Sequence, residues 1–174
     1  MRDNAQLERF ESRLVRGALG GAFAGLLFLL ANMWFADSQG MPAVAPMLDI
    51  STIFHFSDQP EVSPENVVIG LVVHMTLSMG FGIAFSLVVP LLTNARTLVA
   101  GAVGFGIALY LFNFQVLGRL FFEWFQEGPN QLFELFIHAV YGLLLVPFFA
   151  SALKPREATE THRPPVARSA SGTA

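Results

Sequence analysis

The sequence predicts an all-α integral membrane protein, a bundle of four transmembrane helices. Hydrophobic residues make up 53% of its 174 residues and charged residues only 13%, roughly half the charged share of a typical soluble domain. Four apolar runs are long enough, at about 20 residues, to cross the hydrocarbon core of a bilayer. The runs lack the two-residue alternation of barrel strands. Helices are therefore the remaining way to satisfy the backbone in lipid.

The four runs also predict the domain organisation. We place the spans near Leu14–Phe35, Val67–Val89, Leu98–Leu117 and Leu132–Leu153. They lie in one transmembrane domain over 14–153, after a short N-terminal segment over 1–13. The polar, proline-containing tail over 154–174 is predicted to be disordered. The first run is too long for the apolar core of a signal peptide and no convincing cleavage site follows it, so we interpret it as an uncleaved anchor.

The basic residues predict the direction of the spans. They lie before the first span, between the second and third, and after the fourth: Arg2, Arg9, Arg13, Arg16, Arg96, Lys154, Arg156, Arg163 and Arg168. Only Arg119 falls in the opposite set of loops, which are rich in acidic residues. The positive-inside rule then predicts that both termini are cytoplasmic. We expect a multi-pass protein of the bacterial inner membrane with an anionic outer face.

Composition excludes several classes of function. The absence of cysteine excludes disulfides, thiolate metal sites and cysteine nucleophiles. The net charge of −3 and the position of the basic residues disfavour nucleic-acid binding. The sequence contains no P-loop, dinucleotide-binding fingerprint or serine-nucleophile elbow. These observations favour a non-enzymatic protein whose partner is the lipid bilayer, and they leave open a homo-oligomer or a subunit of a membrane complex.

Small and polar residues recur at every fourth position in the spans. Residues four apart share one face of a helix, and small residues let helices approach closely in lipid. We therefore expect these stripes to face the interior of the bundle. The stripe of the second span is Asn66, Gly70, His74, Ser78, Gly82 and Ser86, and that of the fourth is Asn130, Glu134, His138 and Gly142. The first span carries Gly17, Gly21 and Gly25, and the third carries Ala100, Gly104 and Ala108.

The two halves of the chain resemble each other. The first and third spans align with Gly17 on Gly101 and Gly20 on Gly104, and the second and fourth align on their histidines. The chain can thus be interpreted as two parallel copies of one helix hairpin, related by an axis near the membrane normal. We expect Gly20 and Gly104 to lie at helix contacts.

Two interpretations fit the histidines inside the spans. A neutral imidazole can fix packing by bonding a neighbouring helix, and suitable partners are Ser78, Tyr141, Asn32 and Asn113. Alternatively, His74 and His138 can ligate haem, or can join Glu134 to hold a transition metal or exchange protons. The anionic outer face opposes haem propionates, so a cation fits this set better. His74, His138 and Glu134 are therefore the candidate metal ligands.

The order of these features resembles the YagU-like proteins and related small four-helix families of bacterial inner membranes. The resemblance is carried by RGALGGAFAGLLF, VVHMTLSMGFGIAF, GAVGFGIALYLFNF and FIHAVYGLLL and covers Arg16–Phe149. It implies an inner-membrane location and a link to acid tolerance, and it supplies no reaction or site residue. We expect a structural, accessory or acid-response module, with a metal-binding, haem-binding or proton-handling protein as the alternative.

Overall fold

The computed structural model describes residues 2–57, 59–122 and 124–153. The secondary structure of these residues is entirely helical. Four helical segments are long and apolar enough to cross a membrane: Gln6–Ser38, Pro64–Leu91, Ala95–Phe121 and Gln131–Phe149. The predicted all-α four-helix fold is therefore confirmed, and each predicted span overlaps one of these four segments. The predicted disordered tail over 154–174 lies outside the described residues.

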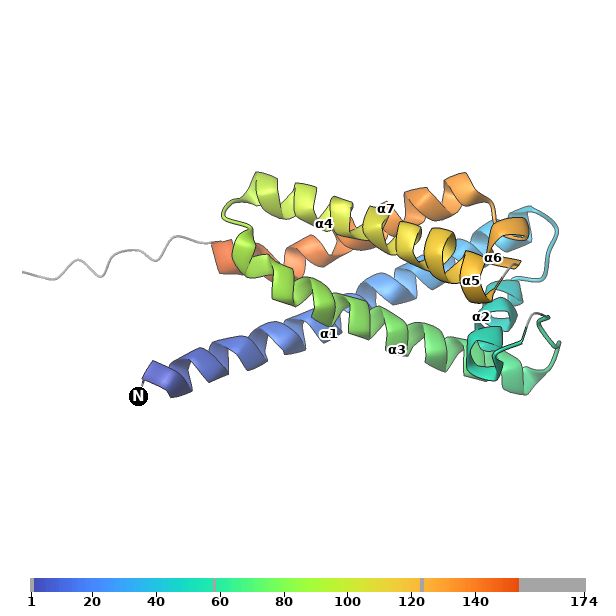
Figure 1. Ribbon diagram of the computed structural model, residues 1–174, viewed down its shortest axis with the longest axis horizontal. Helices are drawn as coiled ribbons and strands as arrows, with labels where there is room; N and C mark the ends of the chain where they lie inside the picture. Colours follow the sequence, from blue (N-terminus) through green and yellow to red (C-terminus); the bar gives the residue numbers. More distant parts are fainter. Residues whose placement is uncertain (1, 58, 123, 154–174) are drawn as a thin grey trace, which may run out of the picture.

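Four long helices run along the molecule, and shorter ones gather at one end of it (Figure 1). The long helices are α1 (Arg2–Ser38), α3 (Pro64–Val88), α4 (Ala95–Tyr110) and α7 (Gln131–Phe149). The shorter segments are α2 (Ala45–His55), η1 (Val89–Leu91), η2 (Leu111–Gly118), α5 (Arg119–Phe121), α6 (Trp124–Glu127) and η3 (Ala150–Leu153). Helices α2, α5 and α6 lie at the end opposite the N-terminus, whereas η3 lies at the N-terminal end.

Polar caps define where three of the long helices begin. The Ser63 hydroxyl accepts a hydrogen bond from the Asn66 N–H at the start of α3, and Pro64 occupies the first turn. Asn94 and Thr97 form a reciprocal capping box at the start of α4. Asn130 accepts from the Phe133 N–H before α7. These side chains satisfy N–H groups that have no partner within the helix.

Two close helix crossings organise the bundle. In the first, a Cβ added to Gly17 would lie 2.6 Å from the Gly82 carbonyl oxygen, and one added to Gly82 would meet the Gly17 carbonyl oxygen. In the second, a Cβ added to Gly106 would meet the His138 carbonyl oxygen. The backbones of α1 and α3, and of α4 and α7, are therefore in direct contact. Small residues permit such contacts between membrane helices.

Most of the stripes that were predicted to face the interior of the bundle are buried, and one is not. The glycine stripe of α1 and the stripe of α3 are buried, as are Glu134, His138 and Gly142 of α7. Asn130 is exposed because it caps the start of α7. The prediction for the third span is wrong: Ala100, Gly104 and Ala108 are exposed, and the buried face of α4 is Leu98, Ala102, Gly106, Leu109 and Tyr110.

The third span carries small residues on two faces, which explains this error. The periodicity of the sequence does not distinguish which of the two faces is buried. In the structure the face that contains Gly106 packs against the backbone of α7 and is buried. Because this face of α4 is the buried one, the residues that occupy equivalent positions in the two helix pairs differ from those that the sequence alignment pairs. Gly21 packs against Ser78, and Ala102 packs against Gly142, the residue aligned with Ser78. The two helix pairs cross in equivalent ways, with α4 displaced by about one turn from the sequence alignment.

The hydrophobic core fills the half of the bundle nearer the N-terminus. Its buried members are Ala24, Phe85, Val89, Leu98, Ala102, Leu109, Tyr141, Leu145 and Phe149. The rings of Phe85 and Phe149 are fully buried, with centroids 5.6 Å apart. A Cβ on Gly20 would approach the Phe148 ring to 3.1 Å, which confirms the predicted contact of Gly20 and helps to join α1 to α7. The other half of the bundle is organised differently.

Gly106 and Gly104 provide a matched test of the crossing between α4 and α7. A methyl group at Gly106 collides with backbone, whereas nothing lies within 4 Å of one added at Gly104. Gly106→Ala should therefore lower the unfolding free energy by about 1–3 kcal/mol, the usual cost of overpacking. Gly104→Ala should leave stability unchanged or slightly raised, because alanine favours a helix over glycine. Thermal unfolding in detergent measures both, and a larger loss at Gly104 would contradict the crossing.

Candidate functional site

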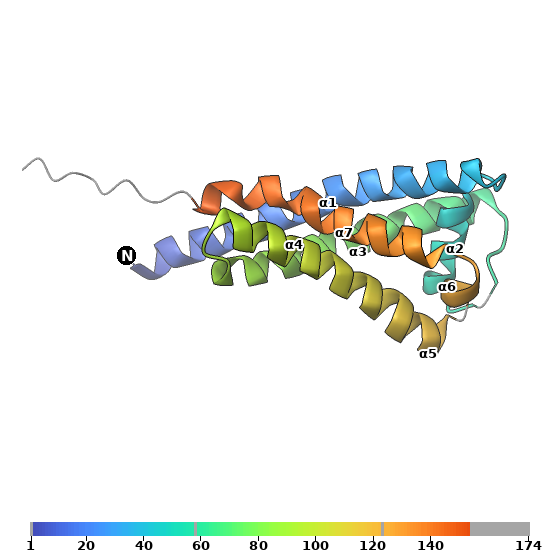
Figure 2. The ribbon, with the colours of Figure 1, turned by 90° about the horizontal axis from the view of Figure 1, so that it is seen from above.

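A cavity of about 800 Å³ lies between the long helices in the half of the molecule away from the chain ends. Here α4 continues through η2 into α5 and diverges from α7 and α1 (Figure 2). Helices α2 and α6 lie at the end of the same region. The volume is within the range of small-molecule pockets, about 300–1,000 Å³.

The segment η2 is a π-helix, and it supplies part of the cavity wall. π-Helical segments within α-helices are rare and are often found at functional sites. Asn113, Phe114 and Leu117 of η2 line the cavity. Aromatic and aliphatic side chains from the other helices form most of the remaining wall, so the polar groups that reach it are few. The most informative are Asn32, Asp49, His74, Asn113, Glu134 and His138.

His74 is buried and bonded to the backbone of α1. Its Nε2 lies 2.8 Å from the Gly25 carbonyl oxygen. A carbonyl only accepts, so Nε2 carries the proton and donates it, and Nδ1 keeps a lone pair. The Ser78 hydroxyl is 3.4 Å from the same Nε2. The bond to Gly25 couples α3 to α1 and agrees with a role in packing.

His138 has a similar arrangement on α7, with the nitrogens exchanged. Its Nδ1 donates to the Glu134 carbonyl oxygen at 2.7 Å, so Nε2 keeps the lone pair. Three aromatic rings surround this imidazole, with centroid distances of 4.8 Å to Phe28, 5.5 Å to Phe114 and 5.9 Å to Tyr110. Each imidazole therefore uses one nitrogen for the fold and has a second nitrogen available for another partner.

Phe28 brings the two histidines into one site. Its ring stacks on His74 at 5.6 Å and meets His138 edge-on at 4.8 Å. Both imidazoles also line the same cavity. The structure thus places His74 and His138 against one phenylalanine ring and along one cavity. Sequence reasoning missed Phe28, because one phenylalanine among many in an apolar span gives no distinguishing pattern.

Glu134 is the most buried carboxyl group at the cavity, at 6% exposure. Its Oε2 lies 3.7 Å from Nδ1 of His138, whose proton is directed to a backbone carbonyl. In the described part of the chain, no group donates a hydrogen bond to this carboxyl. Its position in the first turn of α7 favours a negative charge through the helix dipole.

The other predicted hydrogen-bonding residues bond mainly to backbone. Tyr141 donates to the Ser78 carbonyl oxygen at 2.6 Å and links α7 to α3. Asn32 donates to the Phe28 carbonyl oxygen at 3.2 Å. Of the predicted partners, only Ser78 approaches an imidazole, at the 3.4 Å given above. The network therefore fixes the helices and leaves the free imidazole nitrogens unaffected.

The predicted metal site is only partly assembled. His74, His138 and Glu134 line one cavity. Within residues 2–57, 59–122 and 124–153, however, no group of three His, Asp or Glu side chains has the spacing to hold a metal ion. Binding of a transition metal or haem by these residues stays a prediction.

Helix α2 lies across the end of the cavity that is farther from the N-terminus. This helix lies in the connection between the first two spans, and its Met47 packs against Gly70 of α3. Thr52 accepts a hydrogen bond from the indole of Trp124 at 3.1 Å, which ties α2 to α6. His55 bonds the Asn66 side chain at 2.9 Å, so it has a structural partner.

Asp49 of α2 is a cavity residue that the sequence did not single out. It is half-buried and lines the cavity. Burial raises the pKa of its carboxyl group from 3.8 to about 6, because desolvation disfavours the charged form. No pattern in the sequence distinguishes Asp49 from the exposed acids near it; only the packing of α2 over the cavity does.

The raised pKa of Asp49 predicts how stability depends on pH. The folded protein binds the Asp49 proton more tightly than the unfolded chain does. The contribution of this proton to the free energy of unfolding is therefore complete below about pH 4 and is lost as the pH rises through about 6. Asp49→Asn should therefore raise the melting temperature at pH 7.5 by about 2–4 °C, the effect of about 1 kcal/mol in a chain of this size.

The increase in melting temperature caused by Asp49→Asn should be smaller at pH 4, where the Asp49 carboxyl of the natural protein is already protonated in the folded state. Asp37→Asn is the matched control, because Asp37 is exposed at the end of α1 and does not line the cavity. Thermal unfolding in detergent from pH 4 to 8 measures both variants. Equal behaviour of the two variants would show that Asp49 is not desolvated.

Comparison with known proteins gives no relative for this chain. No protein-family model, curated protein or solved structure matches it significantly. Its similarity to the YagU-like proteins therefore stays a prediction from the sequence. The function is argued below from the cavity and its side chains.

Proposed function

We propose that this protein is a non-enzymatic membrane module that binds a small, largely apolar molecule in its cavity. We further propose that it lies in the bacterial inner membrane with both termini in the cytoplasm. The observation that carries the proposal is the cavity of about 800 Å³, which combines apolar walls with a few inward polar groups. Such a combination is typical of small-molecule sites between helices.

The histidines support binding over packing alone. A packing role requires one hydrogen bond from each imidazole, and the bonds to the Gly25 and Glu134 carbonyl oxygens provide it. The second nitrogen of each ring makes no hydrogen bond within the described chain, and both rings line the cavity. Polar groups buried without a partner are costly. A ligand in the cavity can therefore donate a hydrogen bond to these nitrogens.

The spacing of the polar groups supports binding over catalysis. An activated nucleophile and its base stand about 2.6–3.2 Å apart. Here the Glu134 carboxyl is 3.7 Å from the His138 imidazole, and both imidazoles donate to backbone carbonyls. These groups are arranged to orient a bound molecule.

The distribution of charge supports the proposed orientation. Arg13, Arg16 and Arg96 lie in the parts of α1 and α4 nearest the chain ends, and Arg16 donates to the Ser151 hydroxyl at 2.6 Å there. Asp49 and Glu65 belong to the opposite end. Cytoplasmic loops of membrane proteins are rich in Lys and Arg. The cavity is therefore proposed to lie in the outer half of the membrane.

Single cysteines test this topology, because the natural chain contains none. In spheroplasts, an impermeant maleimide should label Ser57→Cys directly and should label Ser169→Cys only after the membrane is permeabilised. The reason is that the positive-inside rule assigns Ser57 to the outer side and Ser169 to the cytoplasm. Labelling of Ser169→Cys from outside would overturn the assignment.

A cavity-filling substitution tests ligand binding. A neutral hydrophobic fluorescent probe should bind the purified protein saturably in maltoside micelles. Leu117→Trp should weaken this binding about tenfold or more, because Leu117 lines the cavity and the larger ring occupies it. Leu111→Trp is the matched control, since Leu111 lies in the same segment η2 but is 49% exposed on the outer surface.

The melting temperatures of both tryptophan variants confirm that they are folded before binding is compared. Equal binding by the two variants would place the probe outside the cavity. Absence of saturable binding to the natural protein would reject the proposed function.

A further inference from the structure

We propose that the cavity selects lipophilic monovalent organic cations, in which a quaternary ammonium, phosphonium or protonated amine centre is surrounded by apolar groups. This inference rests on the proposed binding function and adds the charge of the ligand. It follows from three features of the cavity: its carboxyl groups, its aromatic rings and its size.

Among the Asp, Glu, Lys and Arg side chains described, those that line the cavity are all acidic. Asp49 and Glu134 line it, and no lysine or arginine does so among the residues that the structure describes. Arg119, the basic residue of the outer loops, is instead held by Gln115, whose side-chain oxygen accepts from it at 2.8 Å. A carboxylate in an apolar cavity is destabilised unless it takes up a proton or a positive charge compensates it. A bound cation provides that compensation.

Glu134 is the carboxyl group best placed to receive the cation. It is more than nine-tenths buried, lines the cavity, and accepts no hydrogen bond from the described part of the chain. The neighbouring His138 does not neutralise it, because the Nδ1 proton is directed to the Glu134 backbone oxygen at 2.7 Å. The hydrogen bonds at His74 and His138 account for one proton on each ring, so neither requires a positive charge that would repel a cation.

The aromatic walls favour a cation that is large and weakly hydrated. Phe28, Phe114 and Tyr141 line the cavity near His138, and Trp124 and Phe125 line it near α2. The faces of such rings carry negative potential and attract quaternary ammonium groups within about 6 Å. A small metal ion requires several oxygen or nitrogen ligands to replace its water, and no group of three acidic or histidine side chains in the described ranges provides them.

Tetraphenylphosphonium and tetraphenylborate provide a direct test, because they have nearly the same shape and opposite charge. Binding is measured by displacement of the neutral fluorescent probe from the purified protein at pH 7.5 in uncharged maltoside micelles, with protein-free micelles subtracted. The phosphonium should bind at least about tenfold more tightly than the borate, because the charge that lines the cavity is negative.

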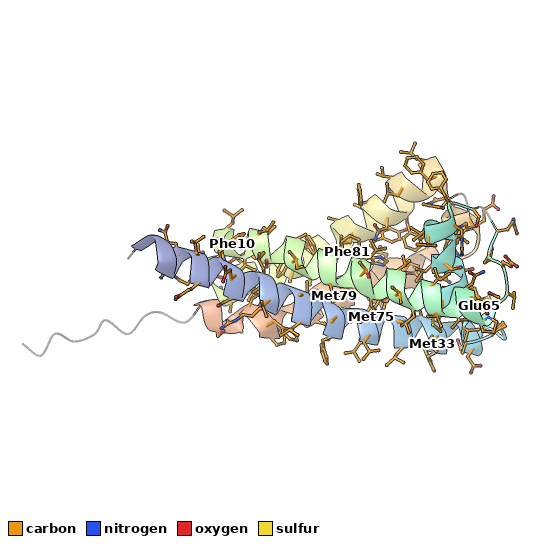
Figure 3. All side chains as sticks on the ribbon, turned by 90° about the horizontal axis from the view of Figure 1, so that it is seen from below. Phe10, Met33, Glu65, Met75, Met79 and Phe81 are labelled. Atoms are coloured by element: carbon orange, nitrogen blue, oxygen red, sulfur yellow. The ribbon has the colours of Figure 1, made fainter. Side chains whose placement is uncertain are left out.

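Substitutions assign the charge preference to the cavity. Glu134→Gln keeps the size of the side chain and should weaken phosphonium binding about tenfold, and more than it weakens binding of the neutral probe. Asp49→Asn should act in the same direction. Glu65→Gln is the matched control, because Glu65 is exposed at the start of α3, at the end of the molecule opposite Phe10 (Figure 3), and does not line the cavity.

The positive charge has two sources, a free organic cation or the choline headgroup of a lipid. Displacement of the phosphonium by short-chain phosphatidylcholine, but not by phosphatidylglycerol of the same chain length, would identify a lipid headgroup. Resistance to both lipids would identify a free cation. Either result agrees with a site for organic cations.

Equal binding of the two ions, or tighter binding of the borate, would overturn the inference. Binding of the neutral probe would then show that the cavity still takes apolar molecules, so the proposed function would stand. If Glu134→Gln does not fold, the comparison of phosphonium and borate binding to the natural protein still tests whether the cavity prefers cations. Loss of selectivity in Glu65→Gln would show that the preference arises from general surface charge and would also overturn the inference.

Discussion

The direct contact of helix backbones at two crossings is the constraint on which the rest of the structure depends. Gly17 and Gly21 meet Ser78 and Gly82 in one crossing, and Gly106 meets the His138 backbone in the other. In lipid, helices gain little from burying apolar side chains against each other, so close packing and interhelical hydrogen bonds hold them together. The same approach brings the His74 ring within hydrogen-bonding distance of the Gly25 carbonyl oxygen, which a bulkier residue than glycine would obstruct. Packing and the orientation of the site therefore have one cause.

The cavity exists because α4 leaves the bundle beyond its crossing with α7. The π-helix η2 continues α4 away from the other helices, and polar contacts hold it there. Tyr110 donates to the Gln131 side chain at 3.0 Å, and Gln115 donates to the Tyr110 hydroxyl at 3.1 Å. The same tyrosine ring meets His138 edge-on. The network that fixes the diverging helix thus also forms part of the wall around the imidazole.

The sequence predicted the architecture better than the site, for physical reasons. The four spans follow from the length of apolar runs, and the buried face of α3 follows from one uninterrupted stripe that includes His74. The third span carries two candidate faces, and only contact with α7 distinguishes Gly106 from Gly104. Phe28 and Asp49 act at the cavity because of the positions of α1 and α2, which no local pattern encodes. Periodicity identifies the face that a helix buries, but it does not identify the residues that neighbouring helices leave unfilled.

The unpaired state of Glu134 connects stability to the proposed binding. A carboxylate that lines an apolar cavity and receives no hydrogen bond from the described chain is destabilising, and an isosteric amide side chain at this position would fill the same space at lower cost. The fold partly offsets this cost by placing Glu134 in the first turn of α7, where the helix dipole favours negative charge. Protonation of the carboxyl group or a positive charge in the cavity can compensate the remainder, and Arg119 does not line the cavity and donates to Gln115 instead. The compensating charge is therefore best supplied by a ligand, whose binding then stabilises the folded bundle by mass action.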